Sequence, residues 1–107
     1  MKLPDSRLIP DWDAFNIAHI ARHGVTPEQV EEVFYGEGPL PTVGARVPAR
    51  WPSGSREARY RLWGTDAPGA LLEVIVAPYP EFDVWRCVTA YPMSKVARRT
   101  YLRRIKG

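Results

Sequence analysis

Apolar residues near the start of the chain recur every three to four positions, which is the spacing of a buried helix face. This pattern predicts a first helix over residues 13–23, with Asp11 and Asp13 both suited to cap its start. Gly24 ends it, because glycine readily adopts the left-handed conformation that follows a helix. The side chains expected on the buried face are Ile17, Ile20 and Ala21.

A second helix is predicted over residues 27–35 by a strong start signal. Thr26 precedes Pro27 and stands three residues before Gln29, which is the arrangement of a capping box. The side chains expected to face inward are Val30, Val33 and Phe34.

Beyond the second helix the pattern changes from helical to alternating. Residues 36–55 are rich in proline and glycine and predict a long loop, with one short strand around residues 42–47. Strands are then predicted over 57–63, 70–77 and 82–90, joined by short turns, and should pair as an antiparallel meander. In the first of these, Arg59 and Arg61 share one face while Tyr60 and Leu62 share the other.

A basic helix over residues 95–104 ends the pattern, with Val96, Tyr101, Leu102 and Ile105 as possible docking residues. The order of elements predicts one α+β domain over residues 1–107. It has two N-terminal helices, an antiparallel sheet of three to four strands and a C-terminal basic helix. We expect the helices on one sheet face and the other face open to solvent or ligand.

Composition narrows the classes of protein to which the chain can belong. No apolar stretch approaches the roughly 20 residues of a membrane-spanning helix, and the N-terminus lacks the apolar core of a signal peptide. Cys87 is the only cysteine, so an internal disulfide is impossible. We therefore expect a cytoplasmic protein that does not contact a membrane.

Charge is distributed unevenly along the sequence. Residues 1–44 hold three basic and seven acidic residues, giving −4, whereas residues 45–107 hold twelve basic and five acidic, giving +7. Ten of those twelve cations are arginines, whose planar guanidinium suits phosphate recognition. A polyanion such as RNA, an acidic protein partner or solvent alone are all compatible with such a surface.

Cleavage of RNA without a metal requires a proton acceptor, a cation at the phosphate and a proton donor. Arg59 and Arg61 are either a phosphate clamp or the charges of an exposed strand edge. Arg86 lies within the last strand and is either an active-site cation or a structural ion-pair partner, for instance of Glu73.

Three further side chains are candidates for proton transfer. His23 is either a proton carrier or a residue that caps its helix, and Tyr91 is either a proton donor or a half-buried aromatic residue. Lys95, at the start of the final helix, is an alternative. His19 and His23 have the spacing of a metal-binding pair, but no third ligand is evident, so neither a metal nor another cofactor is expected.

A second group of residues is a candidate for RNA binding. Trp51, with Arg46 and Arg50 nearby, could stack on an unpaired base or pack on its own domain. On the final helix, Arg98, Arg99 and Arg103 could bind the RNA backbone, seat an acidic antitoxin or remain solvated.

Two ordered series of residues resemble the BrnT family of toxins, which belongs to the RelE/ParE-like superfamily. The first is Trp12-Asp13, Asn16, the Arg-His-Gly-Val-Thr run of residues 22–26 and the helix of residues 28–34. The second is the strand series 59–64, 71–76 and 86–92, followed by a basic helix with Tyr101. The resemblance implies a RelE-like fold, metal-independent endoribonuclease activity as the toxin of a type II toxin–antitoxin system, a cognate antitoxin and a prokaryotic cytoplasm.

The sequence departs from this family at two positions. Ala90-Tyr91-Pro92 stands where BrnT-like proteins have Ala-Arg-Pro, and Ala97 stands where their final helix has a glutamate. Tyr91 and Lys95 could replace the missing groups in a nuclease. Alternatively, the chain is a non-catalytic RelE/ParE-like module that binds an antitoxin or another acidic protein.

Overall fold

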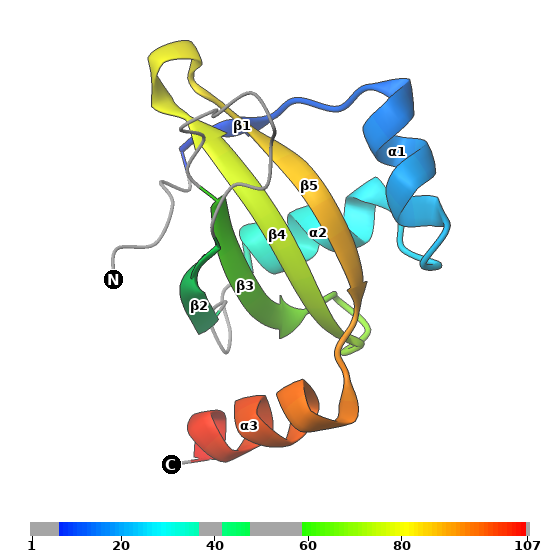
Figure 1. Ribbon diagram of the computed structural model, residues 1–107, viewed down its shortest axis with the longest axis vertical. Helices are drawn as coiled ribbons and strands as arrows, with labels where there is room; N and C mark the ends of the chain where they lie inside the picture. The colour runs from blue at the N-terminus through cyan, green and yellow to red at the C-terminus, as the bar shows by residue number, and fades with distance from the viewer. Residues whose placement is uncertain (1–6, 37–41, 48–58, 107) are drawn as a thin grey trace.

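The computed structural model describes residues 7–36, 42–47 and 59–106 (Figure 1). The elements run in the order β1 (Ile9–Pro10), α1 (Ala14–Ala21), α2 (Pro27–Phe34), β2 (Thr42–Val47), β3 (Arg59–Thr65), β4 (Leu71–Tyr79), the 3-10 turn η1 (Pro80–Phe82), β5 (Val84–Pro92) and α3 (Lys95–Lys106). This confirms the α+β class and the predicted succession of two helices, a series of strands and a final helix, although the unpredicted strand β1 precedes α1.

The described strands form one five-stranded sheet in the order β1-β5-β4-β3-β2. Strands β2 to β5 are antiparallel neighbours, as the sequence predicts. The short β1, however, pairs in parallel with β5, with Ile9 opposite Val84. The expectation of a purely antiparallel sheet of three to four strands is therefore wrong, because a two-residue strand carries too little pattern to be recognised in the sequence.

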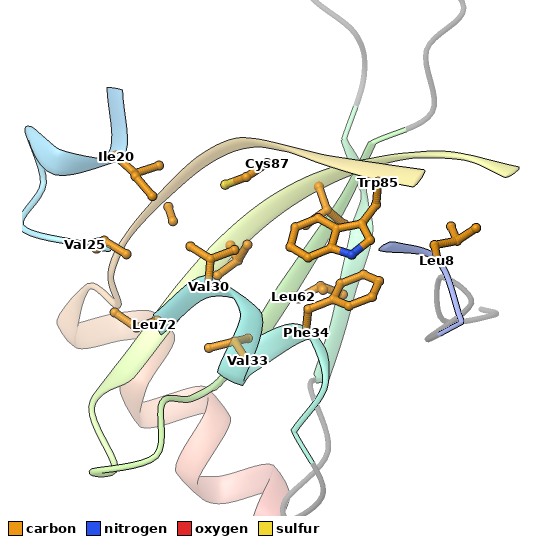
Figure 2. Close-up of a cluster of buried hydrophobic side chains, with 13 residues drawn as sticks. Leu8, Ile20, Val25, Val30, Val33, Phe34, Leu62, Leu72, Trp85 and Cys87 are labelled. Carbon is orange, nitrogen blue, oxygen red and sulfur yellow. The ribbon is translucent and has the colours of Figure 1, made fainter. Parts of the chain in front are cut away.

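One face of the sheet packs against α2 to form the main core (Figure 2). The capping box of Thr26 and Gln29 is present, and Val30, Val33 and Phe34 are buried as predicted. The ring of Phe34 stacks on Trp85 of β5 with a centroid distance of 4.2 Å. Burying each such side chain stabilises the fold by about 1.5–3 kcal/mol, so this layer fixes α2 on the sheet.

Helix α1 packs differently from the prediction. Ile20 is buried, but Ile17 and Ala21 are exposed, and Asn16 is buried instead. The amide nitrogen of Asn16 donates to the backbone oxygen of Cys87 at 2.9 Å. Strand β1 pairs with β5 only as far as Trp85. Beyond that residue α1 covers the edge of β5, and the side chain of Asn16 satisfies the carbonyl of Cys87, which has no strand partner there among the described residues. Gly24 follows the helix with φ of +75°, as expected at this position.

Helix α3 lies on the opposite side of the sheet from α2. Tyr101 is buried with Ala97 and Met93 against Trp63 and Leu71. The other three proposed docking residues of this helix, Val96, Leu102 and Ile105, are exposed. The prediction that all helices share one face is therefore wrong: α3 covers one end of the second face. No helix in the described part of the chain is long and apolar enough to cross a membrane.

Candidate functional site

The second face of the sheet carries three rows of side chains across β3, β4 and β5. Strand pairing places Trp63, Glu73 and Tyr91 in one row and Arg61, Ile75 and Thr89 in the next. In the third row, Ala77 of β4 is opposite Arg86 of β5. Because Tyr60 is opposite Val76, the preceding residue of β3, Arg59, lies beside Ala77 on its other side. Both arginines therefore flank a small alanine side chain on the same face.

Glu73 is the centre of a buried polar cluster. Its side chain accepts hydrogen bonds from Trp63 Nε1 at 2.6 Å and from the hydroxyl of Tyr91. The Nε of Arg61 lies 3.6 Å from Glu73 Oε2. Glu73 itself is only 8% exposed. A buried carboxylate is costly unless it is paired and hydrogen-bonded, and these three partners meet that condition.

The environment of Tyr91 determines which proton chemistry it can perform. Burial, followed by its hydrogen bond to Glu73 and the charge of that carboxylate, raises the pKa of Tyr91 to about 12. The phenol therefore keeps its proton at neutral pH. Tyr91 can act as a hydrogen-bond donor, but it is unsuited to accepting a proton from a ribose hydroxyl.

Arg86 is held by the start of α1 and not by Glu73, so the suggested pair between these two residues is wrong. Its guanidinium donates to the carboxylate of Asp13 and, at 2.7 Å, to Asn16 Oδ1. Asp11 lies 3.8 Å away. The hydrogen bond from the backbone N–H of Asn16 lowers the pKa of Asp13, and the hydrogen bond and charge of Arg86 lower it further, so Asp13 remains a carboxylate. The side chain of Arg86 nevertheless keeps 37% of its surface exposed.

A pocket of about 500 Å³ opens beside Arg86. It is the place where two of the predicted cations meet, since Arg59 of β3 also lines it. The other described residues that line it are Phe15, Asn16 and His19 of α1, Tyr79 of β4, and Cys87 and Val88 of β5. Two guanidinium groups, an imidazole and two aromatic rings thus line one hollow, a combination suited to a phosphate with an attached ring.

A row of aromatic rings connects this pocket with the Glu73 cluster. Phe15 stacks on His19 with centroids 6.2 Å apart, His19 meets His23 at 5.9 Å, and His23 meets Tyr91 at 5.8 Å. The first three rings lie four residues apart along one side of α1 and just beyond its end, which explains their alignment. His23 is therefore close to Tyr91, as a shared site requires, although it does not line the pocket.

The remaining predicted residues lie elsewhere. Lys95, Arg99 and Arg103 are exposed on α3, and Arg98 lines a separate pocket of about 440 Å³ near Gly24 and Leu71. Arg50, Trp51 and the side chain of Arg46 lie outside the described residues. None of these four residues of α3 lines the pocket that contains Arg59 and Arg86.

Cys87 lines the pocket but is unsuited to nucleophilic chemistry. Its side chain is buried, and this burial raises the pKa of the thiol to about 12. The reactive species of cysteine is the thiolate, which is scarce at neutral pH under these conditions. The polar chemistry of the pocket therefore falls to its arginines, His19 and Tyr79.

Sequence reasoning missed Phe15 and Tyr79 as site residues and considered His19 only as half of a metal-binding pair. Within the described ranges, no group of three or more His, Cys, Asp or Glu side chains could hold a metal ion. The spacing of Phe15, His19 and His23 was the one available signal, because it places three rings on the same side of a helix.

The chain matches no protein-family model, no curated protein and no solved structure.

Proposed function

We propose that the protein is a metal-independent endoribonuclease with a RelE-like fold, acting as the toxin of a type II toxin–antitoxin system in a prokaryotic cytoplasm. The observation that supports it most is the meeting of Arg59, Arg86 and His19 at one pocket. The resemblance of residues 12–34 and of the strand series to BrnT-like toxins supports the toxin assignment and a cognate antitoxin as partner.

In this proposal four of the residues that line the pocket take part in the reaction. Arg59 and Arg86 bind the phosphate and stabilise the negative charge that develops on its oxygens. The imidazole of His19 accepts the proton of the ribose 2′-hydroxyl, whose oxygen forms a bond to phosphorus. The bond from phosphorus to the 5′-oxygen breaks, and that oxygen takes a proton from Tyr79 or from water. The products are a 2′,3′-cyclic phosphate and a 5′-hydroxyl end.

The test is incubation of the purified protein with end-labelled single-stranded RNA in EDTA. We expect cleavage by the wild type and a loss of roughly 100-fold or more in the Arg59→Ala/Arg86→Ala double variant and in His19→Gln. Arg22→Ala is the matched control, because Arg22 is an exposed arginine at the end of α1 that does not line the pocket. Arg61→Ala should lose less, since Arg61 contacts Glu73 on another row.

Thermal melting of each variant establishes that it is folded. A folded Arg59→Ala/Arg86→Ala variant that cleaves as fast as the wild type would refute the assignment of the pocket. Cleavage that is abolished by EDTA in the wild type would refute the metal-independent mechanism.

One observation favours the alternative of a non-catalytic interaction module. On α3 the apolar side chains of Val96, Leu102 and Ile105 are exposed among arginines. Such a surface suits an acidic, partly apolar protein such as an antitoxin. This alternative predicts a stable complex with the acidic partner and no RNA cleavage at any protein concentration.

A further inference from the structure

Phe15 is placed where an exposed aromatic ring can meet a bound nucleotide. It lies in the first turn of α1 and is 78% exposed. A single exposed phenylalanine is ordinary on a protein surface, but this one lines the pocket that contains Arg59 and Arg86. Its position beside two cations, rather than its exposure alone, indicates a ligand.

The orientation of His19 extends the aromatic surface. The planes of its ring and of Phe15 differ by only 13°, and the imidazole also lines the pocket. The ring of His19 therefore stacks on Phe15, whose largely exposed ring offers flat, apolar area to a planar group. The helix is held against β5 by Asn16 and Asp13, which contact Arg86, so the rings and the cation belong to one connected unit.

The combination of groups distinguishes among possible ligands. An acidic peptide would satisfy the arginines but has no need of a flat aromatic surface, and an apolar ligand would make no use of the two guanidinium groups. A nucleotide satisfies both, because its phosphate accepts hydrogen bonds from arginine and its base stacks on an aromatic ring. Bases within a duplex are stacked on each other and do not offer a free face.

We propose that Phe15, with the ring of His19 stacked behind it, forms a nucleobase-binding subsite beside the phosphate site of Arg59 and Arg86. The substrate is then an RNA segment with an unpaired base next to the phosphate that is cleaved. This inference rests on the proposed function and specifies its substrate as unpaired RNA.

Binding is measured separately from cleavage with a fluorescent, 2′-O-methylated RNA, which has no free 2′-hydroxyl and cannot react. The probe is offered as a single strand and as a blunt duplex, and fluorescence anisotropy gives each Kd. We expect tighter binding of the single strand and a roughly tenfold weaker Kd for it in Phe15→Ala. Phe15→Trp, which keeps a stacking surface, should bind within about twofold of the wild type.

Phe82 provides the matched control, because it is 72% exposed but does not line the pocket. Phe82→Ala should leave both Kd values unchanged. Equal affinity of the wild type for single strand and duplex, or equal Kd values for Phe15→Ala and Phe82→Ala, would overturn the base subsite. Either result is compatible with RNA cleavage by the wild type in EDTA, so it would overturn the base subsite and not the nuclease proposal. Absence of cleavage by the wild type would refute the nuclease proposal, whatever the Kd values. The two failures are therefore distinguishable.

Discussion

The guanidinium of Arg86 on β5 donates a hydrogen bond to the carboxylate of Asp13, the residue that caps α1. The same side chain of Asp13 accepts from the backbone amide of Asn16 at 2.8 Å. One carboxylate therefore both starts the helix and attaches it to the edge of the sheet. Because Phe15 and His19 lie on this helix, the contact also sets their position relative to Arg86.

Separating these two roles of Asp13 gives a first prediction. Asp13→Ala removes both the cap and the partner of Arg86 and should lower the melting temperature by a few degrees. Asp13→Ser keeps a capping oxygen but removes the charge, so it should recover part of that loss while leaving Arg86 with Asn16 and the more distant carboxylate of Asp11. Melting followed by circular dichroism compares the three proteins.

RNA affinity distinguishes the roles further. Both Asp13 variants should change the Kd for the 2′-O-methylated single strand to a similar extent, because both release Arg86 from the carboxylate. A Kd that follows the melting temperature, with Asp13→Ser nearer to the wild type in both, would contradict a distinct positioning role for the ion pair.

The buried carboxylate of Glu73 gives a second prediction. Glu73→Ala leaves the indole N–H of Trp63, the hydroxyl of Tyr91 and the charge of Arg61 without their acceptor, and should destabilise the fold by about 2–4 kcal/mol. Glu73→Gln keeps one oxygen acceptor and should cost less, about 1–2 kcal/mol. Urea denaturation measures both, and a Glu73→Ala variant as stable as the wild type would contradict the role of Glu73 as the centre of this cluster.

Local signals in the sequence were sufficient for the three helices, for strands β2 to β5 and for much of the core. The capping box of Thr26 and Gln29 is confirmed because every group that forms it lies within four consecutive residues. The alternation of Arg59 and Arg61 with Tyr60 and Leu62 likewise separates the two strand faces before any pairing is known.

Contacts between strands could not be predicted in the same way. In the register of β4 and β5, which shifts by one residue between Ile75 and Val76, Glu73 is opposite Tyr91 and Arg86 is opposite Ala77. The two residues suggested as an ion pair are therefore several positions apart along the sheet. A bulge moves every partner beyond it by one residue, and the sequence carries no clear sign of where it occurs.

The candidate site could be predicted only in part for a related reason. The sequence identifies Arg59 and Arg86 as candidate cations, but their meeting at one pocket depends on strand order and register. The burial of Asn16 depends on α1 covering a strand edge with an unpaired carbonyl, at Cys87. An apolar periodicity treats that asparagine as a surface residue, and so it assigns the wrong face to the helix.

The raised pKa of Tyr91 gives a third prediction, on stability at high pH. The pKa of the phenol is about 12 in the folded protein, against an ordinary value of 10.0. Above about pH 10 the unfolded chain releases this proton while the folded protein retains it, so unfolding becomes more favourable as pH rises towards 12. The stabilising contribution is complete below pH 10 and is lost through this window.

Tyr91→Phe removes the titrating group and should reduce the fall in stability between pH 10 and 12, even though it also removes the hydrogen bond to Glu73 at neutral pH. Urea midpoints of both proteins at several pH values across this window measure the difference in slope. Cys87 also has a pKa raised to about 12, so the variant should keep a residual alkaline dependence. The phenolate absorbance of the wild type minus that of Tyr91→Phe reports the titration directly. A difference signal centred near pH 10 would show that burial and Glu73 do not hold the proton on Tyr91.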